Sequence, residues 1–117
     1  MLDDRQRTLY ARHLLLAEIG TEEQAALCAA TVHAPPGADT RATAVAREYL
    51  VRAGVTFSDE PRGVEAPVPS ATEVDLLAGT PDLREAAAAL AGAFAAVEAI
   101  KRITGVGRPG TLSLELA

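Results

Sequence analysis

The order of extended and helical patterns between residues 30 and 57 constrains the fold more than any other feature of the sequence. Residues 30–34 predict a short strand, the breakers at 35–39 a loop, and position 39 or 40 the start of a helix that runs to 53. Gly54 ends this helix, and residues 55–57 predict the next strand. A strand, a helix and a strand in this order form a βαβ unit with parallel strands. We therefore expect an α/β fold.

The rest of the chain predicts helices around this unit and further short strands. The expected elements are a helix over residues 3–17, a helix over 21–29 with a capping box, a strand over 64–68, a helix over 71–78 with a second capping box, a helix over 81–104 and a strand over 111–116. Pro67 and Pro69 cannot donate ladder hydrogen bonds, so the strand over 64–68 should lie at an edge. A chain of 117 residues has the size of one domain, so we expect a single domain over residues 1–117 with a small, mostly parallel sheet packed by helices.

Apolar residues recur in steps of three and four along the long helix expected over 81–104. They are Leu83, Ala86, Leu90, Ala93, Val97 and Ile100. Such a seam is typical of a buried helix or of a helix–helix interface. A helix of ~25 residues spans ~37 Å and a five-residue strand only ~17 Å, so part of this seam, or of the Leu14-Leu15-Leu16 run, should stay exposed in a monomer. We therefore expect a two-fold homodimer; the alternative is that the N-terminal helices cover the excess within one chain.

Charge and composition argue against several kinds of partner and location. The net charge is −5 and the pI about 4.9, so the chain lacks the positive surface that nucleic-acid or anionic-membrane binding requires. The longest apolar run, residues 86–97, is shorter than the ~20 residues that span a bilayer. The acidic start at residues 1–4 has no apolar run behind it, so we expect no signal peptide. A single cysteine, Cys28, excludes an intramolecular disulfide and fits a cytoplasmic location.

Three stretches of the chain carry motifs that occur together, in this order, in one enzyme superfamily. They are "YARHLLLAEIG" from Tyr10 with Gln24 and Leu27 behind it, "EYLVRAGV" from Glu48, and "GAFAAVEAIKRITGVG" from Gly92. In order, they resemble the N-terminus, the helix after the glycine-rich loop and the late helix of the ThiF/MoeB/HesA superfamily, the ubiquitin-activating-like adenylyltransferases. The resemblance implies a reduced Rossmann-like domain with a long C-terminal helix. It also implies that Arg12 matches an arginine that reaches across a dimer toward the ATP of the partner.

The resemblance fails at the position where that family binds ATP. The family holds the phosphates with a Gly-x-Gly-x-x-Gly loop, whose backbone N–H groups approach them at a helix start. The corresponding stretch here contains Pro35 and Pro36, which have no N–H, and a single glycine, Gly37. Asp39 would put a carboxylate where a phosphate should sit. The segments that carry the family's catalytic Arg and Lys, its Mg-binding Asp and its reactive Cys also have no counterpart.

The absence of the glycine-rich loop and of the catalytic segments predicts a non-catalytic remnant of a ThiF/MoeB-type adenylyltransferase. Such a remnant would act as a structural or protein-interaction module. We expect no catalytic residue, cofactor or metal, and we interpret Arg12 as a surface arginine. Besides a second copy, a full-length ThiF-like relative or a ubiquitin-like sulfur carrier is a candidate partner. The alternative is a residual nucleotide-binding or adenylyltransferase-type enzyme whose site is rebuilt around residues 33–40.

The remaining reactive side chains favour structural roles. Both histidines and Cys28 lack metal-ligand spacing, and we expect His33 to be structural and Cys28 to be a small buried apolar residue. Glu98 and Lys101 lie three apart and should be solvated or locally paired. Gly92 should permit close helix contact, because a mid-helix glycine otherwise costs ~1 kcal/mol against alanine.

Overall fold

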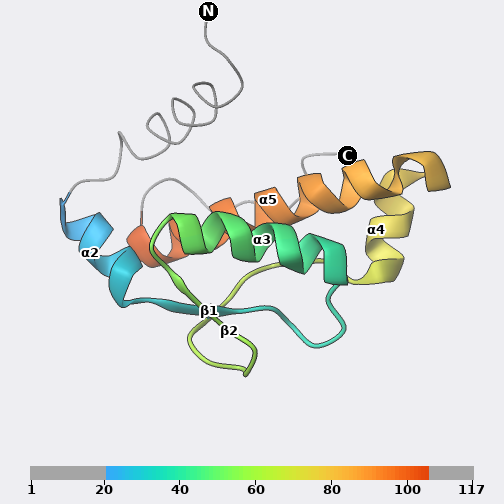
Figure 1. Ribbon diagram of the computed structural model, residues 1–117. Helices are drawn as coiled ribbons and strands as arrows, with labels where there is room; N and C mark the ends of the chain where they lie inside the picture. The colour runs from blue at the N-terminus through green and yellow to red at the C-terminus, as the bar shows by residue number, and fades with distance from the viewer. Residues whose placement is uncertain (1–20, 106–117) are drawn as a thin grey trace, which may run out of the picture.

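The computed structural model describes residues 21–105, so the helix expected over 3–17 and the strand expected over 111–116 lie outside the described residues. The elements are α2 (Thr21–Ala29), β1 (Thr31–His33), α3 (Thr40–Arg52), β2 (Thr56–Ser58), β3 (Val64–Glu65), α4 (Ala71–Ala78), the 3-10 turn η1 (Pro81–Leu83) and α5 (Arg84–Thr104), as Figure 1 shows. The α/β class, the small parallel sheet and the long C-terminal helix are confirmed.

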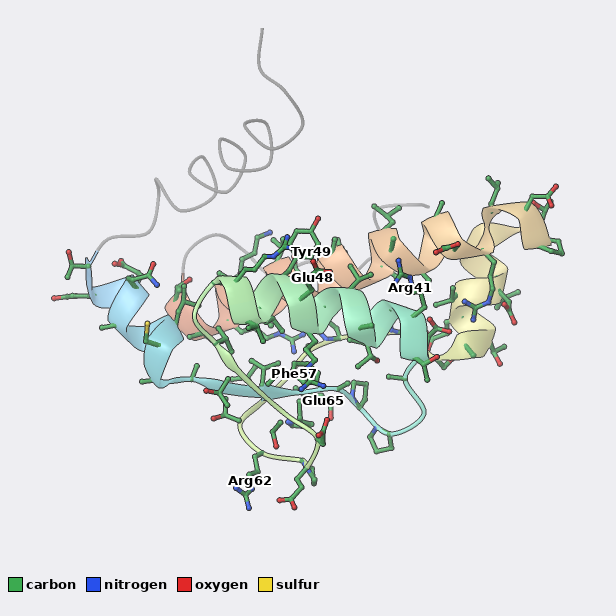
Figure 2. The ribbon with its side chains drawn as sticks, in the orientation of Figure 1. Arg41, Glu48, Tyr49, Phe57, Arg62 and Glu65 are labelled. Carbon is green, nitrogen blue, oxygen red and sulfur yellow. The ribbon has the colours of Figure 1, made fainter. Side chains whose placement is uncertain are left out.

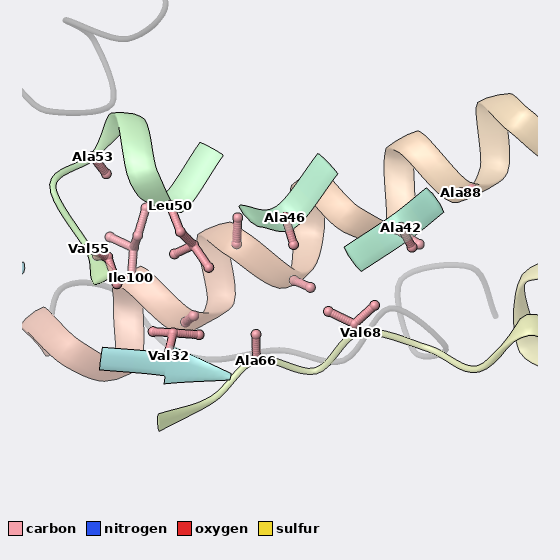
Figure 3. Packing of buried hydrophobic residues seen from close by; sticks show 14 of the residues in the cluster. Val32, Ala42, Ala46, Leu50, Ala53, Val55, Ala66, Val68, Ala88 and Ile100 are labelled. Atoms are coloured by element: carbon pink, nitrogen blue, oxygen red, sulfur yellow. The ribbon is translucent and has the colours of Figure 1, made fainter. Parts of the chain in front are cut away.

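The three short strands form one parallel sheet in the order β2-β1-β3. β1, α3 and β2 therefore make the expected βαβ unit. α3 and α5 lie side by side over one face of this sheet (Figure 1). Val32 of β1 points toward these helices, together with Ala66 and Val68 from the segment that follows β3 (Figure 3). The core thus lies between the helix pair and the sheet.

The connection between β2 and β3 is short for two parallel strands, which usually need about a dozen residues or more. Here residues 59–63 cross from one side of β1 to the other, on the sheet face away from α3 and α5 (Figure 1). Gly63 lies against β1 with a φ of +74°, and a Cβ atom at this position would be 2.0 Å from the carbonyl oxygen of Thr31. Glycine is required at this position because of both the left-handed backbone and the close contact.

β3 is shorter than the strand expected over residues 64–68. It pairs with β1 over Val64–Glu65 only, and the N–H of Ala66 then donates to the carbonyl of His33 at 2.9 Å. Pro67 has no N–H with which to continue the ladder. The edge position that this proline predicts is confirmed by the strand order.

The contact between α3 and α5 is built from small residues. The buried residues of α5 are Ala87, Ala88, Ala91, Gly92, Ala95, Ala96, Glu98, Ala99 and Ile100. A Cβ atom on Gly92 would lie 2.3 Å from the carbonyl oxygen of Ala42 and 2.8 Å from the Cβ of Val45, both on α3. The close helix contact predicted for Gly92 is therefore confirmed.

The apolar seam of α5 does not face this core. Leu83 and Leu90 are each 55% exposed and Ala86 is exposed, whereas Ala93 and Val97 are half-buried. Of the seam residues only Ile100 belongs to the core. The expectation that part of the seam stays exposed in a single chain is confirmed, and the alternative of a buried seam is wrong because α5 is apolar on two sides. The close approach of α3 admits only the side that carries alanine and glycine.

Several local signals for helix ends and helix pairs are confirmed, but Thr80 makes no cap hydrogen bond with its side chain, and Thr21, the expected cap of α2, is already its first helical residue. The hydroxyl of Ser70 accepts from the N–H of Glu73 at 3.2 Å, and the Glu73 carboxylate accepts from the N–H of Ser70 at 3.1 Å, which completes the capping box of α4. Gly105 ends α5 in the left-handed conformation. Glu48 and Arg52 form an i, i+4 ion pair on α3. The expected start of the long helix at residue 81 is a turn of 3-10 helix, and the α-helix begins at Arg84.

Replacing Gly92 by Ala should destabilise the protein, although alanine is the better helix former by ~1 kcal/mol. The added methyl would meet the backbone of α3, so the helices must separate and lose contacts with their neighbours. We expect a net loss of about 1–3 kcal/mol in the free energy of unfolding, measured by urea denaturation. Ala86→Gly, at an exposed position of the same helix, is the control for helix propensity and should cost about 1 kcal/mol. A Gly92→Ala protein more stable than the wild type would contradict the close contact.

Candidate functional site

The start of α3 follows the carboxyl end of β1, and α/β folds commonly bind anionic ligands at this position. β1 is the central strand, and the strands that follow it lie on opposite sides of it. In sheets with this order, the crevice for a ligand lies outside the carboxyl ends at the point where the order reverses. Residues 33–40, which the sequence singled out, occupy this position.

The loop after β1 folds back on itself instead of leaving its backbone open. The carbonyl of Pro35 accepts from the N–H of Ala38 at 3.2 Å, which closes a turn. Pro36 and Gly37 lie exposed at the tip of this turn, and Gly37 has a φ of +78°. Ala38 also forms an antiparallel bridge with Ser70, at the start of α4. The loop is therefore joined to the segment before α4.

Asp39 occupies the N-terminus of α3. Its N–H donates to the carbonyl of Pro69 at 2.8 Å, and its Oδ2 accepts from the N–H of Ala42 at 2.9 Å. Its Oδ1 accepts from Nη2 of Arg84 at 2.5 Å, and the residue is only 4% exposed. The hydrogen bond from Arg84, helped by the backbone of Ala42 and opposed by burial, lowers the pKa of Asp39 below its ordinary value of 3.8. The helix end that could bind an external anion already holds a carboxylate.

Arg84 connects three helices. It is the first residue of α5, and its Nη2 reaches Asp39 at the start of α3 while its Nε donates to Oδ1 of Asp75 on α4 at 2.8 Å. These contacts raise the pKa of Arg84, with the hydrogen bond to Asp39 as the main cause. Sequence reasoning missed this residue. The available signal was a cation in the first turn of a helix, where the helix dipole disfavours positive charge unless a carboxylate lies nearby.

His33 is buried at the carboxyl end of β1. It holds residues 59–63, which connect β2 to β3 and which we call the crossover loop. Its Nδ1 lies 2.8 Å from the carbonyl oxygen of Arg62, and because a carbonyl can only accept, Nδ1 donates. Its Nε2 lies 3.4 Å from Oε2 of Glu65, the residue beside it in the sheet. Figure 2 shows Arg62 and Glu65 on the sheet side away from the helices. The hydrogen bond from Nδ1 to the loop between β2 and β3 agrees with the structural role predicted for His33.

The other singled-out residues lie away from this site. Cys28 is exposed, so its interpretation as a buried apolar residue is wrong: the short α2 places Leu27 alone in the core. Glu98 is 1% exposed and pairs with Lys101 at 3.2 Å, so the locally paired alternative is confirmed and the solvated one is wrong. Arg12 lies outside the described residues.

Comparison with known proteins identifies no family for this chain. No family model matches it, and no curated protein or solved structure matches it either. Among residues 21–105, no helix has the combined length and apolarity needed to cross a membrane. The same residues contain no group of three or more His, Cys, Asp or Glu side chains placed to hold a metal ion. The resemblance to the ThiF/MoeB/HesA superfamily thus stays a prediction from three sequence motifs.

Asp39→Asn should lower the free energy of unfolding at pH 7 by about 1–2 kcal/mol, because it weakens a buried helix cap and its ion pair. The pKa of Asp39 is lowered on folding, so the carboxylate stabilises the protein fully above 3.8, and this contribution is lost as the pH falls through the lower folded value. The difference between wild type and Asp39→Asn should therefore shrink as the pH falls below about 4, as measured by urea denaturation across this range.

Asp75→Asn is the matched control for this experiment. Its carboxylate contacts the same arginine, but its side chain is 63% exposed, so the solvent screens the pair. We expect a small change in stability with little dependence on pH. Equal effects of the two substitutions would contradict the role assigned to Asp39.

Proposed function

We propose that this chain is a non-catalytic remnant of a ThiF/MoeB-type adenylyltransferase, whose reduced Rossmann-like domain acts as a structural or protein-interaction module. The observation that carries the proposal is the carboxylate of Asp39 at the start of α3, held by the backbone of Ala42 and by Arg84. In the family that the sequence resembles, this is the position of the phosphates of ATP.

Three features oppose a nucleotide at this position. A phosphate would meet the negative charge of Asp39, which is ionised at neutral pH because its pKa is lowered. The neighbouring cation, Arg84, is paired with Asp39 and Asp75, and binding an anion in their place would leave a buried carboxylate without its partner. Pro35 and Pro36 have no N–H, and the N–H of Asp39 is bonded to the chain before α4.

An interaction role fits the surface of the helices. Large apolar side chains are exposed on α4, η1 and α5: Leu76 at 78%, and Leu83 and Leu90 at 55% each. Exposed apolar side chains of this size favour binding to another protein where they form a patch. We take a second copy of the chain as the first partner, with a full-length ThiF-like relative or a ubiquitin-like sulfur carrier as the other candidates. A cytoplasmic location suits each of these partners and the single cysteine.

Titration with ATP and Mg²⁺ to millimolar concentration should give no saturable isotherm in calorimetry, because the phosphate position is filled by Asp39. Thermal unfolding with and without ATP is a second readout, since a ligand at 100 times its Kd would add about 2.7 kcal/mol to stability. We expect the same midpoint in both conditions. A saturable, magnesium-dependent isotherm would refute the proposal and favour a rebuilt nucleotide site around residues 33–40.

A further inference from the structure

The side of α5 opposite the core is apolar along most of its length. Its residues are Ala86, Leu90, Ala93 and Val97; together with Leu83 of η1, just before the helix, we call them the outer seam. No charged side chain occurs in α5 between Glu85 and Glu98. Exposing these apolar side chains to water is unfavourable, so burying the outer seam against a partner would be favourable.

The outer seam has the spacing of a heptad repeat with large and small residues in alternation. Leu83, Leu90 and Val97 recur at every seventh position, and Ala86 and Ala93 lie between them. When two such helices pack in parallel, large residues face large ones and alanine faces alanine, which leaves gaps. When they pack antiparallel, Leu90 and Val97 can each face an alanine of the other helix, and these layers interdigitate. The outer seam is thus complementary to itself in the antiparallel orientation.

One antiparallel alignment of the two α5 helices satisfies both the packing of large against small residues and the attraction between their charged ends. With Leu90 facing Ala93 of the second copy, Val97 faces Ala86, and the two-fold axis passes between residues 91 and 92. This is also the midpoint of the uncharged stretch 86–97. Asp82 of η1 then lies beside the last turn of the other α5, which carries Arg102 and Lys101, the partner of Glu98. The opposed helix dipoles favour the same orientation.

We propose that two copies of this chain form a homodimer in which the outer seams of α5 pack antiparallel, with Leu90 and Ala93 at the centre. The inference rests on the proposed interaction role and names its partner. A seam of about two heptads buries less than the ~800 Å² per partner of a standard interface, so the dimer dissociates at low concentration.

The oligomeric state of wild type and two matched variants tests the proposal. Sedimentation velocity at micromolar to submillimolar concentration should give twice the monomer mass of 12.1 kDa for the wild type. Leu90→Glu should be a monomer with an unchanged circular dichroism spectrum, because Leu90 is 55% exposed within one chain. Leu90→Ala, which keeps the helix intact, should raise the dissociation constant by about 10-fold or more.

Val51→Glu is the control, since Val51 is 54% exposed on α3 and gains the same charge away from the outer seam. It should remain a dimer. A wild-type monomer at the highest concentration overturns the proposal. So does a dimer that survives Leu90→Glu, or one that Val51→Glu also splits.

The orientation is tested by single cysteines in a Cys28→Ser background. Ala93→Cys should cross-link with a short bismaleimide, because positions 93 of the two copies lie ~4.5 Å apart along the axis. Leu83→Cys should not, because positions 83 lie ~25 Å apart in this register. Cross-linking at both positions overturns the antiparallel arrangement. If neither position cross-links, the outer seam is not the dimer interface.

The ATP titration is run on the same samples to separate the two proposals. A monomer without ATP binding overturns the homodimer and leaves the non-catalytic assignment standing. Saturable ATP binding overturns that assignment, whatever the mass of the particle.

Discussion

The contact of Gly92 with the backbone of Ala42 sets the spacing of α3 and α5, and the rest of the core depends on this spacing. A side-chain carbon at position 92 would lie 2.3 Å from the Ala42 carbonyl oxygen, so the helices are as close as their backbones allow. At this spacing the facing side of α5 carries mostly alanine and glycine, and a chain with 3% aromatic residues still has a packed interior. The same constraint leaves Leu90 on the outer side of α5. The small-residue core and the exposed outer seam therefore have one cause.

The ion pair between Asp39 and Arg84 holds the starts of the two helices together. It joins the start of α3 to the start of α5, and Asp75 extends it to α4. Burying a carboxylate is costly unless it is paired and hydrogen-bonded, and Asp39 is both. The carboxylate of Asp39 also occupies the start of α3, where α/β folds commonly bind an anionic ligand. Stability and the proposed loss of activity follow from the same contact.

The crossover loop shows how such a small parallel sheet is completed. Parallel sheets are usually covered by helices on both faces, but here the face away from α3 and α5 carries residues 59–63 across β1. Gly63 lets the loop approach Thr31 closely, and the Nδ1–H of His33 holds the carbonyl of Arg62. Residues 59–63 thus connect β2 to β3 directly, where larger α/β domains use a longer connection between parallel strands. His33 is therefore best understood as part of this connection.

The sequence by itself determined the features that depend on residues a few positions apart. The βαβ order, the capping box of Ser70 and Glu73, and the missing donors at Pro35 and Pro36 are of this kind, because each follows from local backbone chemistry. Only the tertiary structure decided which side of α5 is buried, because both sides are apolar at helical spacing and the choice depends on Ala42, far away in the chain. The pairing of Asp39 with Arg84, 45 residues apart, was equally hidden. Long-range partners of this kind have no fixed spacing, so no periodicity in the sequence can reveal them.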